Sequence, residues 1–93
     1  MARMVRIEDL VGSASSGDEV AAFELGMCHA SGSGGVGFDL IQAHRWFNVA
    51  VAGGYRPALD WRHEIAMEMS AREVAEAQKL ARATLSEMFR KAA

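Results

Sequence analysis

Residues 21–54 read AAFELGMCHASGSGGVGFDLIQAHRWFNVAVAGG, and their pattern predicts the central part of the fold. Four glycines lie between residues 32 and 37, with helix-forming sequence on both sides. Glycine adopts positive φ without steric cost, so such a run predicts a reversal of the chain. Asp39 and Gln42 then form a D-x-x-Q pair, which is typical of a helix start. The stretch therefore predicts two antiparallel helices joined by a glycine-rich turn.

Apolar and small residues recur with helical spacing on both sides of this turn. The first helix is predicted over residues 19–31, with Asp18 as its N-cap. Its predicted inner side carries Ala21, Ala22, Leu25, Gly26 and Met27, and Phe23 is expected to point elsewhere. The second is predicted to start at Asp39 and to stop at Gly53, with an apolar stripe of Leu40, Ala43, Trp46, Phe47, Ala50 and Val51.

The flanking sequence predicts three further helices. A short one over residues 5–15 would use Val5, Ile7, Leu10, Val11 and Ala14. Pro57 suits the first turn of a helix within residues 55–69. Ser70 and Glu73 form an S-x-x-E capping box before a last helix over residues 71–91. Its predicted packing side carries Val74, Ala77, Ala81, Leu85 and Met88. We therefore expect one all-α domain of about five helices.

The amino-acid composition disfavours some classes of function. The 93 residues are 51% hydrophobic, and 10 basic against 12 acidic side chains give a net charge of −2, which disfavours a general nucleic-acid binder. A helix-turn-helix DNA binder is therefore only a weak alternative. The single cysteine fits a reducing compartment. We see no signal-peptide pattern and no apolar run that would insert in a membrane, and so expect a cytoplasmic protein.

The chain also contains an imperfect internal repeat with an offset of 37 residues, which aligns Gly17 with Gly54 and Ala21 with Ala58. Each copy has a helix end, a glycine and then an alanine four residues later. Small residues there would allow two helix axes to approach closely. Such a period is typical of helical solenoids.

At this point the sequence resembles the Sel-one-like repeat, a relative of the tetratricopeptide helical hairpin. The matching positions are Ala21, Leu25, Gly26, Asp39, Ala43, Trp46, Phe47, Ala50, Gly54 and Ala58, with Gly35 and Val36 in the turn. The resemblance implies a small bacterial member with a short right-handed α-α superhelix: a half-repeat at 5–15, a full repeat at 18–54, and capping helices at 55–69 and 71–91.

The sequence departs from the family pattern at two places. His29 stands at the family's tyrosine position, and Arg62 and His63 stand where the first copy has Leu25 and Gly26. A charged pair there suggests that no further repeat follows and that the last helix closes the core. Terminal repeats need such a cap.

The sequence contains only incomplete matches to catalytic motifs. The glycines lack the lysine and preceding strand of a phosphate loop, and His63-Glu64 matches only two letters of H-E-x-x-H. Cys28 has no evident activating base, so it is interpreted as a small buried residue. We expect no enzymatic activity and no cofactor.

A metal- or ligand-binding regulatory protein using Cys28, His29 and His44 is the alternative. Adjacent residues such as Cys28 and His29 point about 100° apart on a helix, which disfavours one shared ion. We expect instead that His29 is a half-buried packing residue and that His44 lies on the solvent side.

The resemblance implies an adaptor, scaffold or accessory subunit of a larger protein complex, which binds a protein or peptide. Trp61, Tyr55, Arg56 and Arg45 are the candidate partner-binding residues, because an aromatic residue beside arginines is the usual composition of an interaction hot spot.

Overall fold

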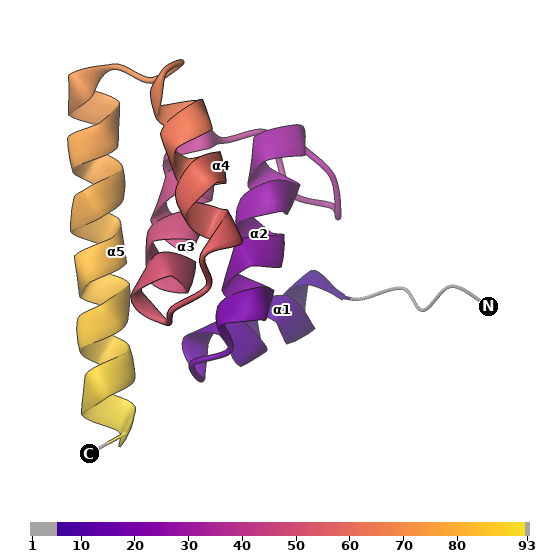
Figure 1. Cartoon of the computed structure of the whole chain (residues 1–93). Coiled ribbons are helices and arrows are strands. Elements are labelled where there is room, and N and C mark those ends of the chain that lie inside the picture. The colour runs from indigo at the N-terminus through magenta and orange to yellow at the C-terminus, as the bar shows by residue number, and fades with distance from the viewer. Residues whose placement is uncertain (1–5, 93) are drawn as a thin grey trace.

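The computed structural model describes residues 6–92, which form five α-helices and no strand (Figure 1). The helices are α1 (Ile7–Ser15), α2 (Glu19–Ser31), α3 (Leu40–Ala52), α4 (Pro57–Ala66) and α5 (Ala71–Ala92). The prediction of an all-α fold with about five helices is confirmed. None of the helices in this part of the chain is both long and apolar enough to cross a bilayer.

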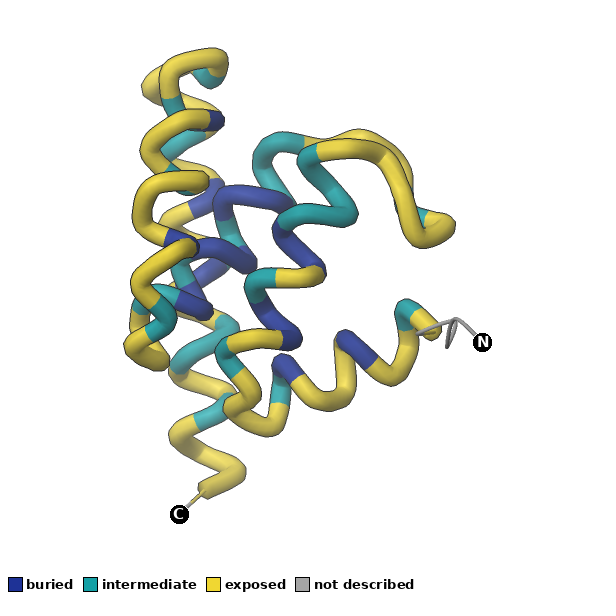
Figure 2. Tube along the Cα trace, turned by 45° about the vertical axis from the view of Figure 1, so that its right-hand side comes forward, coloured by how far each residue is buried: buried dark blue, intermediate teal, exposed yellow. Residues whose placement is uncertain are grey.

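Helix α3 is the centre of the fold. Helices α2, α4 and α5 all pack against it, and α1 packs against α2. Figure 2 shows the buried segments gathered around α3, with the outer side of α5 exposed. The largest fully buried side chains are Phe47 of α3 and Leu25 of α2. All the apolar positions of the predicted repeat motif are buried: Ala21, Leu25, Ala43, Trp46, Phe47, Ala50 and Ala58.

Small residues set the distance between α2 and α3. A Cβ added to Gly26 would overlap the aromatic ring of Phe47. Ala22 of α2 and Ala43 and Ala50 of α3 are completely buried beside this contact. Because a side chain larger than these would hold the two axes apart, the close α2–α3 packing depends on them.

The glycine-rich segment makes the predicted reversal. Gly32 ends α2 in the left-handed conformation with φ 74°. Asp39 starts α3, and its side chain accepts a hydrogen bond from the Gln42 backbone N–H at 3.1 Å. The expected capping box is one-sided, however, because the Gln42 side chain instead accepts a bond from Arg45. By contrast, Ser70 and Glu73 bond to each other's backbone N–H groups in both directions.

The structure corrects several sequence predictions. Helix α4 ends at Ala66, three residues before the predicted end of its segment. Val11 faces solvent, because α1 buries only Leu10 and Ala14. Phe23 does not point away from the core: its ring packs against those of Phe47 and Tyr55, with centroids 5.8 and 5.0 Å apart. Val5, at the start of the predicted 5–15 helix, lies outside the described residues.

Helix α5 covers α3 and then continues beyond it. Its 22 residues span about 33 Å, against about 20 Å for the 13 residues of α3. Ala77 and Ala81 are the buried residues of α5, and Leu85 and Met88 are only partly buried. The C-terminal end of α5 therefore extends past the core (Figure 1).

Candidate protein-docking groove

An open groove of about 770 Å³ lies at the C-terminal end of α5. One wall is the end of α1 and the turn into α2, the floor is the end of α3, and the other wall is the last two turns of α5. The apolar residues that line it are Ala14, Val49, Ala52, Leu85, Met88, Phe89 and Ala92. We refer to it below as the α5 groove.

The apolar character of the groove follows from the length of α5. The stripe that buries Ala77 and Ala81 continues to Leu85 and Met88, where α3 is ending. Phe89 lies next to this stripe and is 78% exposed, the most exposed large apolar residue among residues 6–92. The groove therefore combines a partly covered apolar lining with an uncovered aromatic side chain at its edge.

Opposite charges line the two walls. Asp18 and Glu19 stand at the start of α2, and Lys91 stands on α5. The Asp18 carboxylate accepts hydrogen bonds from the backbone N–H groups of Val20 and Ala21, at 3.0 and 3.1 Å. Within residues 6–92, neither Glu19 nor Lys91 takes part in an ion pair. The groove thus has an acidic side and a basic side that do not neutralise each other.

A smaller hollow of about 380 Å³ adjoins the groove and shares Ser15, Met88 and Lys91 with it. Arg45 lines this hollow. Its guanidinium lies 4.5 Å from the centre of the Trp46 ring and donates to Thr84 Oγ1 at 3.1 Å. Burial lowers the pKa of Arg45. The guanidinium group is occupied by its contacts with Trp46 and with α5, so it is not free to bind a partner.

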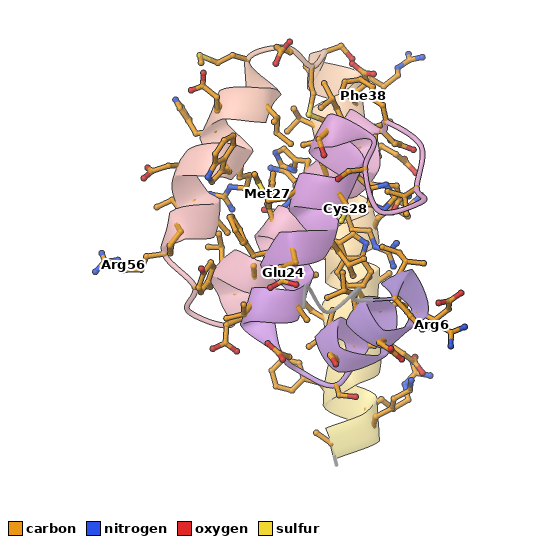
Figure 3. All side chains as sticks on the ribbon, turned by 90° about the vertical axis from the view of Figure 1, so that its right-hand side faces the viewer. Arg6, Glu24, Met27, Cys28, Phe38 and Arg56 are labelled. Atoms are coloured by element: carbon orange, nitrogen blue, oxygen red, sulfur yellow. The ribbon has the colours of Figure 1, made fainter. Side chains whose placement is uncertain are left out.

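The four predicted partner-binding residues are in different surroundings. Trp61 of α4 is 44% exposed, and Arg56 extends away from the protein at the start of α4 (Figure 3). Tyr55 is half-buried against Phe23. Arg45 contacts Trp46 and α5. Two of the four are therefore occupied in packing, and Trp61 and Arg56 are left on the surface.

His44 corrects the sequence-based expectation, because it is buried, with 3% exposure, and does not lie on the solvent side. Arg62 of α4 donates a hydrogen bond to Asn48 Oδ1 at 2.7 Å. The Asn48 amide must then donate through Nδ2 to His44 Nδ1, 2.9 Å away, which requires that this nitrogen is unprotonated. Burial lowers the pKa of His44, and the positive charge of Arg62 lowers it further.

Cys28 and His29 are both half-buried near the end of α2, as expected for His29. Cys28 packs beside the glycine-rich turn, where a Cβ on Gly34 would lie 3.0 Å from its sulfur (Figure 3). The Nδ1 atom of His29 is buried without a hydrogen-bond partner. Across residues 6–92, no three side chains of the types that bind metals come together as a possible ion site.

Neither a protein-family model nor a curated protein matches the chain. The Sel-one-like resemblance therefore stays a prediction based on the motif residues themselves.

The sequence pattern does not predict the α5 groove. The pattern places Leu85 and Met88 on the packing side of the last helix and does not mark Phe89. One signal was available: the predicted last helix, over residues 71–91, is much longer than the predicted helix before Gly53, so its final turns extend beyond that partner.

Proposed function

We propose that the protein is a non-enzymatic protein-interaction module, an adaptor or accessory subunit of a larger bacterial complex, which binds a protein segment in the α5 groove. The observation that carries the proposal is the groove itself, with Phe89 exposed at its edge. An open groove lined mainly by apolar side chains favours docking of another apolar surface, because contact between water and apolar groups is unfavourable.

The shape of the groove favours an amphipathic helix as its occupant. The two turns of α5 that form one wall are about 11 Å long, which matches two turns of an incoming helix. Helix-in-groove binding places apolar residues at positions i, i+3, i+4 and i+7 against such a lining. The charged residues Glu19 and Lys91 would then contact the polar sides of the bound helix.

The repeat interpretation is part of this proposal. Gly17 and Gly54, which the offset of 37 residues aligns, both have positive φ, at 103° and 95°. Ala21 and Ala58, which follow them in the next helices, are both buried. This local similarity supports a repeat of the helix–glycine–helix unit. Arg62, which replaces the leucine of the first copy, hydrogen bonds to α3 instead of packing as an apolar residue.

The proposal is tested by affinity capture from a lysate of the native organism, with the full chain immobilised and the bound proteins quantified by mass spectrometry. Phe89→Asp should abolish capture of the partner. Met67→Asp is the matched control, because Met67 is 67% exposed but does not line the groove. An identical set of captured proteins for the parent and Phe89→Asp would contradict the proposed site.

A third variant, Trp61→Ala, tests the candidate partner-binding set predicted from the sequence, which is Trp61, Tyr55, Arg56 and Arg45. We expect it to leave capture unchanged. Loss of capture with Trp61→Ala but not with Phe89→Asp would move the binding site from the α5 groove to the exposed side of α4.

A further inference from the structure

We propose that the occupant of the α5 groove is the C-terminal end of α5 from a second copy of this chain, so that two copies form a two-fold symmetric dimer. The inference rests on the proposed function, because it names a partner for the same groove.

The apolar surface at the end of α5 is complementary to itself. A two-fold interface uses the same surface on both copies, so that surface must carry both a projecting group and a hollow that receives it. The last two turns of α5 provide both: Phe89 projects, and Leu85 and Met88 line the hollow beside it. When two such ends pack side by side, each Phe89 is covered by the lining of the other copy.

The positions of Glu19 and Lys91 favour a second copy of this chain over other partners with an apolar surface. Lys91 stands at the end of α5, and Glu19 stands across the groove at the start of α2. An α5 end that enters the groove from a second copy brings its own basic residue to the acidic wall. Two-fold symmetry then places Lys91 beside the partner's Glu19 twice, once on each side of the axis.

The charges that would pair in this way are available. Glu19 and Lys91 form no ion pair with other groups in residues 6–92, whereas Arg90 lies 3.6 Å from Glu87 within its own helix. Phe38 and Met67, the other most exposed large apolar residues, do not line the groove. The apolar and charged features that a self-association needs therefore occur together at the end of α5.

The first test is the mass of the protein in solution, measured by sedimentation equilibrium from about 10 µM to about 1 mM. The parent should approach twice its 10.1 kDa chain mass as the concentration rises. Phe89→Asp should raise the dimer dissociation constant about 30-fold or more, because it places a charge against the apolar lining of the other copy. Met67→Asp should leave the constant unchanged. A parent that remains at 10.1 kDa throughout overturns the proposal.

The second test uses charge reversal to show that Glu19 and Lys91 meet between copies. Glu19→Lys alone places two lysines at each contact, and Lys91→Glu alone places two glutamates there. Each variant by itself should dimerise at least about tenfold more weakly than the parent. An equimolar mixture of the two should dimerise again, because both contacts of the mixed dimer then join a lysine to a glutamate.

The mixing result separates this arrangement from others. A mixture no more dimeric than its two components overturns the proposal, because contacts within one chain or through another face gain nothing from mixing. Circular dichroism of each variant checks that α-helix content equals that of the parent. A negative result for the dimer can be distinguished from a negative result for the proposed function. If the parent is monomeric but still captures a protein that Phe89→Asp does not capture, only the second copy is refuted as the occupant of the groove.

Discussion

Gly26→Ala tests the close packing of α2 and α3. The new Cβ would overlap the Phe47 ring, including Cζ at 3.0 Å, and Phe47 is fully buried, so the ring has no free space to enter. Gly12→Ala is the matched control. Gly12 also lies inside a helix, but a Cβ there would have no neighbouring atom within 4 Å.

The expected magnitude follows from two opposing effects. Replacing glycine by alanine within a helix stabilises the folded state by about 0.5–1 kcal/mol, and this gain is common to both variants. Overpacking a well-packed contact by one methyl group costs about 1–3 kcal/mol, and only Gly26→Ala has this cost. The free energies of unfolding of the two variants should therefore differ by about 1–3 kcal/mol, with Gly12→Ala the more stable.

Urea denaturation followed by circular dichroism measures this difference, because the midpoint changes while the slope should stay constant. In a thermal melt, each kcal/mol should move Tm by about 4–8 °C. Phe47→Leu provides a further check, since removing the ring should make Gly26→Ala less harmful in the double variant. If Gly26→Ala proves as stable as Gly12→Ala, then Gly26 does not limit how closely α2 and α3 approach.

Three more predictions concern stability. Trp46→Ala should destabilise the fold by about 3–5 kcal/mol, enough to unfold much of a domain this small; a mutant with parental circular dichroism and melting would count against Trp46 as a core residue. Asp18→Ala should cost about 0.5–2 kcal/mol by removing two N-cap hydrogen bonds, and an unchanged urea midpoint would contradict this. Because its pKa is lowered on folding, His44 should contribute stability above about pH 6.5 that is lost as the pH falls through the lowered pKa. His44→Gln should therefore flatten the pH dependence of unfolding, and a slope equal to that of the parent would argue against the buried, neutral His44.

The helices were predictable from sequence because their signals are local. Asp18, Asp39 and the Ser70–Glu73 pair bind backbone groups within three residues, so their roles follow from short motifs. The spacing of Ala43, Trp46, Phe47 and Ala50 likewise fixes one face of α3 without reference to the rest of the chain. These features account for the agreement between the predicted and observed helices.

The candidate site was not predictable in the same way, because it depends on how distant segments pack. Whether Phe89 is covered depends on where α3 ends beneath α5, and a short sequence pattern does not predict how two helices align. Arg45 was expected to be available to a partner, but it also donates a hydrogen bond to Thr84, 39 residues away. His44 was expected on the solvent side, but it is buried, and Arg62 from α4 holds its hydrogen-bond partner Asn48.

The most direct test of the docking groove is a dilution series of ¹H–¹⁵N correlation spectra of the full chain. Backbone amides that line the groove, such as those of Gly12, Gly17 and Gly53, should shift with protein concentration. Those of Gly35 and Gly37 in the glycine-rich turn should not. Shifts confined to α4 around Trp61, or no shifts at any concentration together with unchanged capture by Phe89→Asp, would contradict the account.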